Sequence, residues 1–516
     1  MPTVERLSGW DYATWRSATE DPVMRSTMVG IMVLEKSPDW ERLRSRYERA
    51  SRQVLLLRKK VIEGPVGIAN PRLVVDPNFD LSFHLRRFRL PEGATWQHVL
   101  DEAAQQSMTD FDHNRPLWKV TLLEGAPGGR SVLISKLHHA IADGQGALAL
   151  GVALVDLDEK GFDLGPMPEE PSADELTPRH FAEIMIHDNA EWLLSTASGI
   201  ARGAVPTLMQ LLNTPEEAVS RIFDTVSSII RFANSPYSPL SPIMTKRSVN
   251  YHFANFDMRF RHLKEAAKRD GHTINDVFLA AIARGLAKYH EAQGETVHQL
   301  NINMPISTRK PGKEAQNAVS IVRFELPLDV SDVRELMDSL SEIVKKLRAE
   351  PALDYANQLG EISRFVPREL LAAAAQASDV TASNVPGPPI PIYLAGAKVE
   401  SIVPCPPPIG AAVFVALLTY AGHASVGMAL DDAAITDRDL FVKCMREGFA
   451  EVLGQPVSSG DPFEDEPAAP APVAKKVPAA KKVPAAKKAP AAKKVDAEAK
   501  DAPGATPQTG GEQSAP

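Results

Sequence analysis

Cysteine is nearly absent from this chain, which has only Cys405 and Cys444 among its 516 residues. Two cysteines exclude a disulfide framework and a CxxC metal or redox site, and they suit a reducing, cytoplasmic setting. Long hydrophobic runs are absent too, since the longest near-apolar run, Gly410 to Leu418, is far shorter than the roughly 20 residues that span a bilayer. Met1 to Gly9 lacks the apolar segment of a secretory signal. If the protein acts on lipids, we expect it to work from the membrane surface.

The net charge of −8 argues against nucleic acid as the main partner of the folded part. The chain is also too long for a single core. Residues 1–165 alternate strand-like and helical segments, and residues 246–455 repeat that rhythm, which predicts two related α/β domains. Between them, residues 166–245 read as a helical connector flanked by proline-rich breaks. Its apolar helix faces fit a protein core or, in part, a membrane surface.

Hydrophobic periodicity predicts the individual elements of both domains. Strands are expected at 27–34, 76–83, 118–123, 131–136, 248–256, 300–304, 320–326, 413–419 and 424–430. Helices are expected at 39–60, 96–109, 147–155, 259–269, 273–289, 332–348, 369–377 and 437–451. Thr273, with Asp276 three residues later, predicts a capping box at the start of one helix.

The last segment, residues 456–516, differs in composition from the rest of the chain. Between Val473 and Val495 the unit AAKKVP recurs every six residues, and its prolines exclude a continuous helix. We therefore predict a disordered tail. Its lysine pairs could be attracted to anionic lipid, by about 1 kcal/mol per lysine near the surface, or to nucleic acid. A solvated tail without a partner fits equally well.

A pair of histidines, followed by an acid and a glycine, ends the predicted strand at 131–136, in the stretch His138-His139-Ala140-Ile141-Ala142-Asp143-Gly144. Histidine titrates near neutrality, so it can take a proton from a hydroxyl and return it. A pair that only caps a turn is the alternative. The spacing could also suggest metal ligands, but no third ligand with a recognised spacing accompanies it, and no metal is expected.

This stretch matches the HHxxxDG signature of CoA-dependent acyltransferases. Further stretches resemble the bacterial wax ester synthase/diacylglycerol acyltransferases, and they follow in that family's order: Pro71-Arg72, Asp76 to Leu81, His84 to Arg87, Asn114 to Trp118, Asn275 to Val277, Met304 to Arg309, and Ser383 to Pro388. Two segments depart from the family. Ser8-Gly9-Trp10-Asp11 replaces Ser-Pro-Leu-Asp, and a proline-rich entry ending in Lys246-Arg247 replaces Gly-Pro-Arg-Arg.

The resemblance implies a fold of two chloramphenicol-acetyltransferase-like α/β domains with an active-site tunnel between them. It implies transfer of a long-chain acyl group from acyl-CoA to diacylglycerol, giving triacylglycerol, or to a fatty alcohol, giving a wax ester. Acyl-CoA is then a substrate, and no further cofactor is expected. The protein is expected in the cytoplasm, peripherally associated with the inner face of the membrane or with lipid inclusions.

The family signature also implies roles for the residues around the histidine pair. It places the general base at His139, which leaves His138 as a packing or orienting residue. Asp143 would fix the loop by pairing with a basic residue at the substrate site, and Arg309 is the candidate. Gly144 lets the backbone turn where a side chain would crowd the tunnel.

Other matched positions are expected to bind substrate or to stabilise charge. Asn275 either donates to a developing oxyanion or only caps its helix, and Asp276 follows it in the Asn-Asp motif. Pro116-Leu117-Trp118 and the turn that begins at Asn384 are expected to form tunnel wall or core. The basic residues that contact the CoA phosphates cannot be located from the sequence.

Two other functions remain open. A condensation-type transferase would take its acyl group from a different donor, such as a carrier protein, but no carrier domain follows in this chain. A protein that binds the surface of a membrane or lipid droplet without turnover is the non-enzymatic alternative.

Overall fold

The structure, a computed structural model, describes residues 5–63, 71–141, 151, 153–173, 238–307, 319–349 and 368–464. All of them belong to the first of the two units that the chain forms, Met1–Asp465. The first half contains the strands β1 (Glu5–Arg6), β2 (Thr27–Leu34), β3 (Lys59–Ile62), β4 (Arg72–Val75), β5 (Leu85–Arg89), β6 (Trp118–Glu124) and β7 (Ser131–His138). Its helices are α1 (Gly9–Glu20), α2 (Trp40–Gln53), α3 (Leu81–His84) and α4 (Trp96–Met108).

The second half is built from more strands and longer helices. Its strands are β8 (Tyr251–Arg259), β9 (Gln299–Ser307), β10 (Val319–Pro327), β11 (Val380–Pro386), β12 (Tyr393–Leu394), β13 (Ala397–Cys405), β14 (Val413–Tyr420) and β15 (His423–Asp431). Its helices are α8 (Phe260–Asp270), α9 (Ile274–Ala292), α10 (Val333–Arg348), α12 (Arg368–Gln376) and α13 (Arg438–Leu453).

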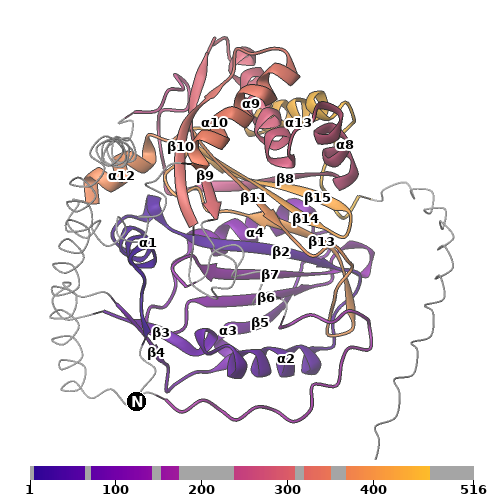
Figure 1. The fold of residues 1–516 in the computed structure, drawn as a ribbon. Helices are drawn as coiled ribbons and strands as arrows, with labels where there is room; N and C mark the ends of the chain where they lie inside the picture. Colours follow the sequence, from indigo (N-terminus) through magenta and orange to yellow (C-terminus); the bar gives the residue numbers. More distant parts are fainter. Residues whose placement is uncertain are drawn as a thin grey trace, which may run out of the picture. The chain divides into compact units, whose positions relative to one another are not determined.

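Each half has a six-stranded sheet (Figure 1). The first has the order β12-β13-β2-β7-β6-β5, and the second has the order β10-β9-β11-β14-β15-β8. A small sheet, β1-β4-β3, lies beside the first. Although β12 and β13 belong to the second half of the chain, β13 pairs antiparallel with β2, from Val399 opposite Leu34 to Cys405 opposite Val29. The expected pair of α/β domains is confirmed, and the second half completes the sheet of the first.

The two halves also share a hydrophobic core. Helix α2 packs on one face of the first sheet, and α4 packs on the other. The cluster around α4 includes Tyr251 and Phe253 of β8. Trp96 Nε1 donates to Asn255 Oδ1 (2.7 Å), and the Tyr251 hydroxyl donates to Ser107 Oγ (2.7 Å). Helices α8, α9, α10 and α13 cover the outer face of the second sheet (Figure 1).

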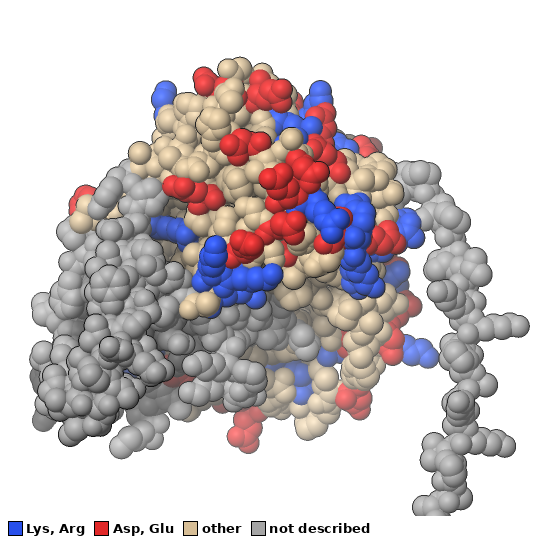
Figure 2. Space-filling model, turned by 45° about the horizontal axis from the view of Figure 1, so that its top comes forward, with Lys and Arg blue, Asp and Glu red and all other residues tan. Residues whose placement is uncertain are grey.

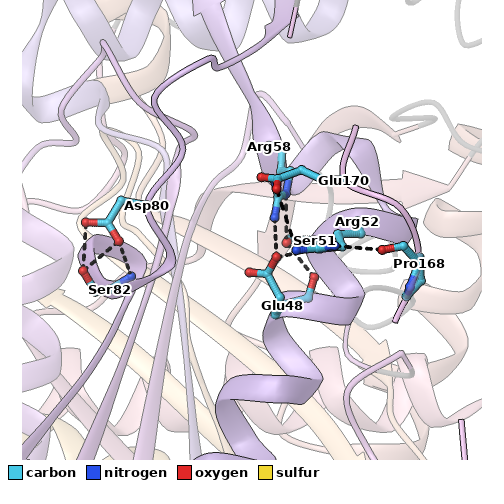
Figure 3. Close-up of polar contacts among 8 residues, drawn as sticks. All are labelled: Glu48, Ser51, Arg52, Arg58, Asp80, Ser82, Pro168 and Glu170. Atoms are coloured by element: carbon cyan, nitrogen blue, oxygen red, sulfur yellow. Dashed lines mark hydrogen bonds and ion pairs between the residues drawn. The ribbon is translucent and has the colours of Figure 1, made fainter. Parts of the chain in front are cut away.

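The prediction of a strand at 76–83 is wrong. Asp76 Oδ1 accepts from the Asn78 amide (3.1 Å), which makes a turn. Asp80 then caps the short helix α3 by accepting from the amide of Ser82 (2.9 Å; Figure 3). These carboxylates bind backbone N–H groups that a strand would need for its ladder, so the strand begins only at β5.

Three strands of the second half, β11, β12 and β13, were missed because prolines lie in or beside them. Asn384 to Pro386 was expected in a rigid turn, but these residues end β11. Pro404 lies in β13 opposite Gly30, and β12 reaches only the first residues of β13. None of the described strands pairs with the outer side of β13 at Pro404, so proline's lack of an N–H breaks no hydrogen bond to a described strand there. The helix expected at 39–60 also ends earlier, at Gln53, before β3.

Several predictions fall outside the described residues. These are most of the helix at 147–155, most of the helical connector and the lysine repeats of the tail. The fold continues past residue 456, however, because Gly460 O accepts from Asn255 Nδ2 (2.6 Å) and the Phe463 ring packs edge-on against Trp96. Among the described helices, none has the length and apolarity needed to cross a membrane.

Candidate active site

The histidine pair lies where β7 ends, and both neighbouring segments hold its backbone. The His138 amide donates to Leu117 O (3.0 Å), at the start of β6. The His139 amide donates to Ser26 O (2.8 Å), just before β2. Hydrogen bonds to both sides fix the direction in which the chain leaves the sheet, so the pair has a rigid backbone.

The side chain of His138 is buried, with 3% of its surface exposed. Its ring lies edge-on to Trp15 (5.4 Å between centroids) and Phe111 (5.8 Å). Nδ1 accepts from the Ala140 amide (3.1 Å), which leaves the ring proton on Nε2. Burial lowers the pKa of His138 to about 3, so the ring is neutral near pH 7. These contacts favour a packing role for His138.

His139 differs from its neighbour because it is only half-buried. The two residues that follow it, Ala140 and Ile141, enter a core cluster with Trp15 and Leu117. Trp15 belongs to α1, the helix at the segment where the sequence departs from the family. The chain around His139 is therefore supported by a helix and a sheet.

The two residues of this segment that match the family, Ser8 and Asp11, have a structural role. Ser8 is the N-cap of α1, and its hydroxyl oxygen accepts from the Asp11 amide (3.2 Å). The Ser8 hydroxyl also donates to Asp11 Oδ2 (2.7 Å). The serine and the acid that this chain shares with the family thus cap the helix that supports His138.

The stretch Pro116-Leu117-Trp118 is buried beside the histidines. Leu117 is fully buried. Trp118 Nε1 donates to Leu57 O (2.7 Å), and the Trp118 ring stacks on His84 with 4.5 Å between centroids. His84 Nδ1 donates to Trp118 O (2.8 Å), and burial lowers the pKa of His84 to about 4.

Asn275 and Asp276 lie in the first turn of α9, in the second half. The expected capping box is confirmed: the Asp276 carboxylate accepts from the Thr273 amide (2.9 Å), and Thr273 Oγ1 accepts from the Asp276 amide (3.3 Å). The cap therefore belongs to Thr273 and Asp276 rather than to Asn275. Asn275 Nδ2 points toward the Met304 sulfur (3.7 Å) on β9, the strand that carries another matched motif.

Asn384 is exposed on β11, beside Leu417 of β14. Gly387 follows that strand, where a Cβ would overlap the Thr419 carbonyl oxygen, so this position requires glycine. Asp143, Gly144 and Arg309 lie outside the described residues. The described residues contain no group of three or more side chains placed to hold a metal ion.

Asp156 fixes the chain beyond the histidine motif. It is fully buried, and its carboxylate accepts from Arg42 Nη2 (2.6 Å) and from Arg46 of α2. Its backbone exchanges two hydrogen bonds of 2.8 Å with Tyr393 of β12. One residue thereby joins the segment after the histidines to the segment after Asn384.

Further along, the same segment lies against the end of α2 (Figure 3). Arg58 donates to Glu48 (2.7 Å) on α2 and to Glu170 (2.7 Å) on the segment. Arg52 donates to Pro168 O (2.9 Å). Sequence analysis did not find Asp156 or Arg58, because their partners are far away in the chain.

Residues 7–278 match the family model of the wax ester synthase/diacylglycerol acyltransferase catalytic domain, and residues 315–452 match that of the WS/DGAT C-terminal domain. A Mycobacterium tuberculosis protein named as a diacylglycerol O-acyltransferase is 33% identical over 87% of this chain and 92% of its own length. The O-acyltransferase WSD of Acinetobacter baylyi is 27% identical over 68% of this chain and 77% of its own.

Solved structures show the same fold. The wax ester synthase/diacylglycerol acyltransferase from Marinobacter aquaeolei VT8 matches with a TM-score of 0.56 at 19% identity, covering 87% of this chain and 98% of that one. The first condensation domain of the calcium-dependent antibiotic synthetase matches with a TM-score of 0.57 at 14% identity, covering 87% and 95%.

Proposed function

Because the chain belongs to the wax ester synthase/diacylglycerol acyltransferase family, we propose that it transfers a long-chain acyl group from acyl-CoA to diacylglycerol, giving triacylglycerol. Fatty alcohols are proposed as further acceptors, giving wax esters. The observation that carries the proposal is the rigid histidine pair at the end of β7, with one neutral buried ring and one half-buried ring. Acyl-CoA serves as a substrate, and no other cofactor is required.

In this proposal His139 is the general base. It removes the proton of the acceptor hydroxyl as the hydroxyl oxygen attacks the thioester carbonyl, and it returns that proton to the departing CoA sulfur. Asn275 and the backbone N–H groups at the start of α9 stabilise the oxyanion. Asp143 and Arg309 fix the loop after the histidines, and Gly144 allows its turn. His138 supports His139 from the core.

A matrix of donors and acceptors tests this function. Purified protein is supplied with acyl-CoAs of several chain lengths and with diacylglycerol, monoacylglycerol or a fatty alcohol. CoA release is followed with a thiol reagent, and products are separated by thin-layer chromatography. We expect CoA release that depends on the acceptor, and a triacylglycerol product. Absence of CoA release with every acceptor would leave a lipid-surface binding protein as the better description.

Peripheral contact with a membrane or lipid droplet is part of the same proposal, because both products and acceptors partition into lipid. The lysine pairs of residues 473–495 are proposed to add electrostatic attraction to anionic lipid. A flotation assay with anionic vesicles at low salt compares the full chain with a chain lacking residues 466–516. Equal flotation of both would contradict the role of the tail and leave the acyltransferase proposal unaffected.

A further inference from the structure

A pocket of about 190 Å³ lies between the C-terminal part of α4 and the strands β6 and β7. Phe83, Phe111 and Trp118 form its aromatic walls. Two lysines, Lys119 and Lys136, also line it. Three acids, Glu102, Asp110 and Asp112, line it as well, so its suitability for an organic anion depends on how these charges pair.

The two lysines are direct cross-strand partners, Lys119 on β6 and Lys136 on β7. Like charges in this arrangement repel each other unless an anion lies between them. Lys136 Nζ donates to the carbonyl of Thr109 at the end of α4 and lies 4.2 Å from the Phe111 ring. Burial, followed by repulsion from Lys119, lowers the pKa of Lys136 to about 8. A phosphate would relieve this repulsion.

Lys119 has a positive charge that no salt bridge within the described residues neutralises. Its amine lies 4.6 Å from the Phe83 ring, and within the described ranges it has no carboxylate at salt-bridge distance. Burial and then Arg86 lower the pKa of Lys119, against the attraction of Asp112. Arg115 and Arg86 approach the same ring, at 4.2 Å and 5.7 Å. Three cations therefore surround one aromatic ring.

Two of the three acids of the lining have a nearer cationic partner, so one carboxylate, Glu102, is left against the two lysines. Asp112 pairs with Arg115 Nε (3.3 Å), and Asp110 pairs with His113 Nε2 (3.5 Å). Glu102 accepts from Gln106 Nε2 (2.8 Å). Elsewhere on the surface, as on the face in Figure 2, basic side chains lie among acidic ones.

The pocket is next to the histidine pair. Lys136 precedes His138 by two residues, so both side chains lie on the same face of β7, with about 7 Å between their Cα atoms. Phe111 contacts both: its ring is 4.2 Å from Lys136 Nζ and 5.8 Å from the His138 ring. An anion held by Lys119 and Lys136 would thus lie beside His138, the residue that precedes the proposed base His139.

We infer that this pocket binds a phosphate group of the acyl-CoA donor, with Lys119 and Lys136 as the residues that contact it. This inference rests on the proposed function, which supplies the donor. The phosphate sits in the pocket, and the pantetheine arm extends from there along β7 toward His139. A phospholipid headgroup offers the same chemistry, so the experiment must separate the two sources.

Steady-state kinetics with two donors test the inference. Palmitoyl-CoA carries the phosphates, whereas the palmitoyl thioester of pantetheine carries none. For Lys119→Ala we expect KM for palmitoyl-CoA to rise about ten-fold or more, since a charged hydrogen bond is lost. KM for palmitoyl-pantetheine and kcat for both donors stay as in the wild type, and Lys119→Arg recovers part of the loss. Lys264→Ala is the matched control, because its amine also lies over an aromatic ring, at 4.4 Å from Phe260 on α8.

Equal KM changes for both donors, or no change for either, would overturn the inference while the wild-type rate upholds the proposed function. Wild-type protein that releases no CoA would instead refute the proposed function. Loss of flotation on anionic vesicles by Lys119→Ala, with an unchanged KM for palmitoyl-CoA, would assign the pocket to a lipid headgroup and also overturn the inference. An unchanged melting temperature of Lys119→Ala confirms that its fold is intact.

Discussion

Replacing His138 by asparagine should separate its structural role from the chemistry of its neighbour. The Asn side chain can accept from the amide two residues later, as His138 Nδ1 does from Ala140. The backbone turn is thereby kept. The variant loses the imidazole ring that packs against Trp15 and Phe111, and it loses the titrating group.

The magnitude follows from the pKa of the buried ring. His138 titrates near 3 in the folded protein, well below the roughly 6.5 of an exposed histidine. Between pH 7 and pH 5 the unfolded chain therefore takes up a proton that the folded chain refuses. The contribution of the neutral His138 ring to the free energy of unfolding is therefore complete above the pKa of the unfolded chain. It decreases as the pH drops, by about 2 kcal/mol at pH 5. The stability of His138→Asn does not have this pH-dependent decrease. Its free energy of unfolding is instead lower by about 2 kcal/mol at every pH, because a cavity replaces the ring.

Urea denaturation of both proteins at pH 7, 6 and 5 measures this difference. His138→Asn should be less stable than the wild type by about 2 kcal/mol at pH 7 and nearly equal to it at pH 5. Other titrating groups, including His84, are the same in both proteins and cancel in the comparison. A stability difference that stays constant across the three pH values would refute the buried, neutral state of His138.

Three further variants test other parts of the structure. Asp156→Asn leaves the buried Arg46 without its carboxylate, so unfolding by denaturant should show a loss of about 3–5 kcal/mol, and a loss under 1 kcal/mol would contradict the buried pair. Gly427→Ala places a Cβ against a backbone carbonyl of β13 and should cost roughly 3 kcal/mol, whereas Gly30→Ala on β2 meets open space and should be tolerated; equal melting temperatures would count against this packing. Asn275→Ala should lower kcat by about 10²–10³-fold without a change in melting temperature, and an unchanged kcat would remove its oxyanion role.

Local patterns in the sequence were enough to predict much of the fold. The alternation in β2, the apolar runs of β14 and β15 and the capping box at Thr273 and Asp276 depend on neighbouring residues, and all were found. The place of β13 in the first sheet depends on pairing across the chain, so no local pattern reveals it. The strand prediction at 76–83 was wrong because the side chains of Asp76 and Asp80 accept hydrogen bonds from nearby backbone amides.

The candidate site likewise has features that the sequence predicts and features that only the fold reveals. Its motifs were recognised one by one, including the histidine pair and Asn275. The pairing of Lys119 with Lys136 was not, because it appears only when β6 and β7 lie in register. The role of Asp156 also depends on contacts with α2 and β12.

The rate of His139→Ala tests the central claim most directly. The variant keeps the backbone hydrogen bond from residue 139 to Ser26 O, and its melting temperature is measured to show that it folds. Loss of a general base should lower CoA release from palmitoyl-CoA with diacylglycerol by about 10²–10⁴-fold. A folded variant that retains the wild-type rate would contradict the assignment of His139 as the base.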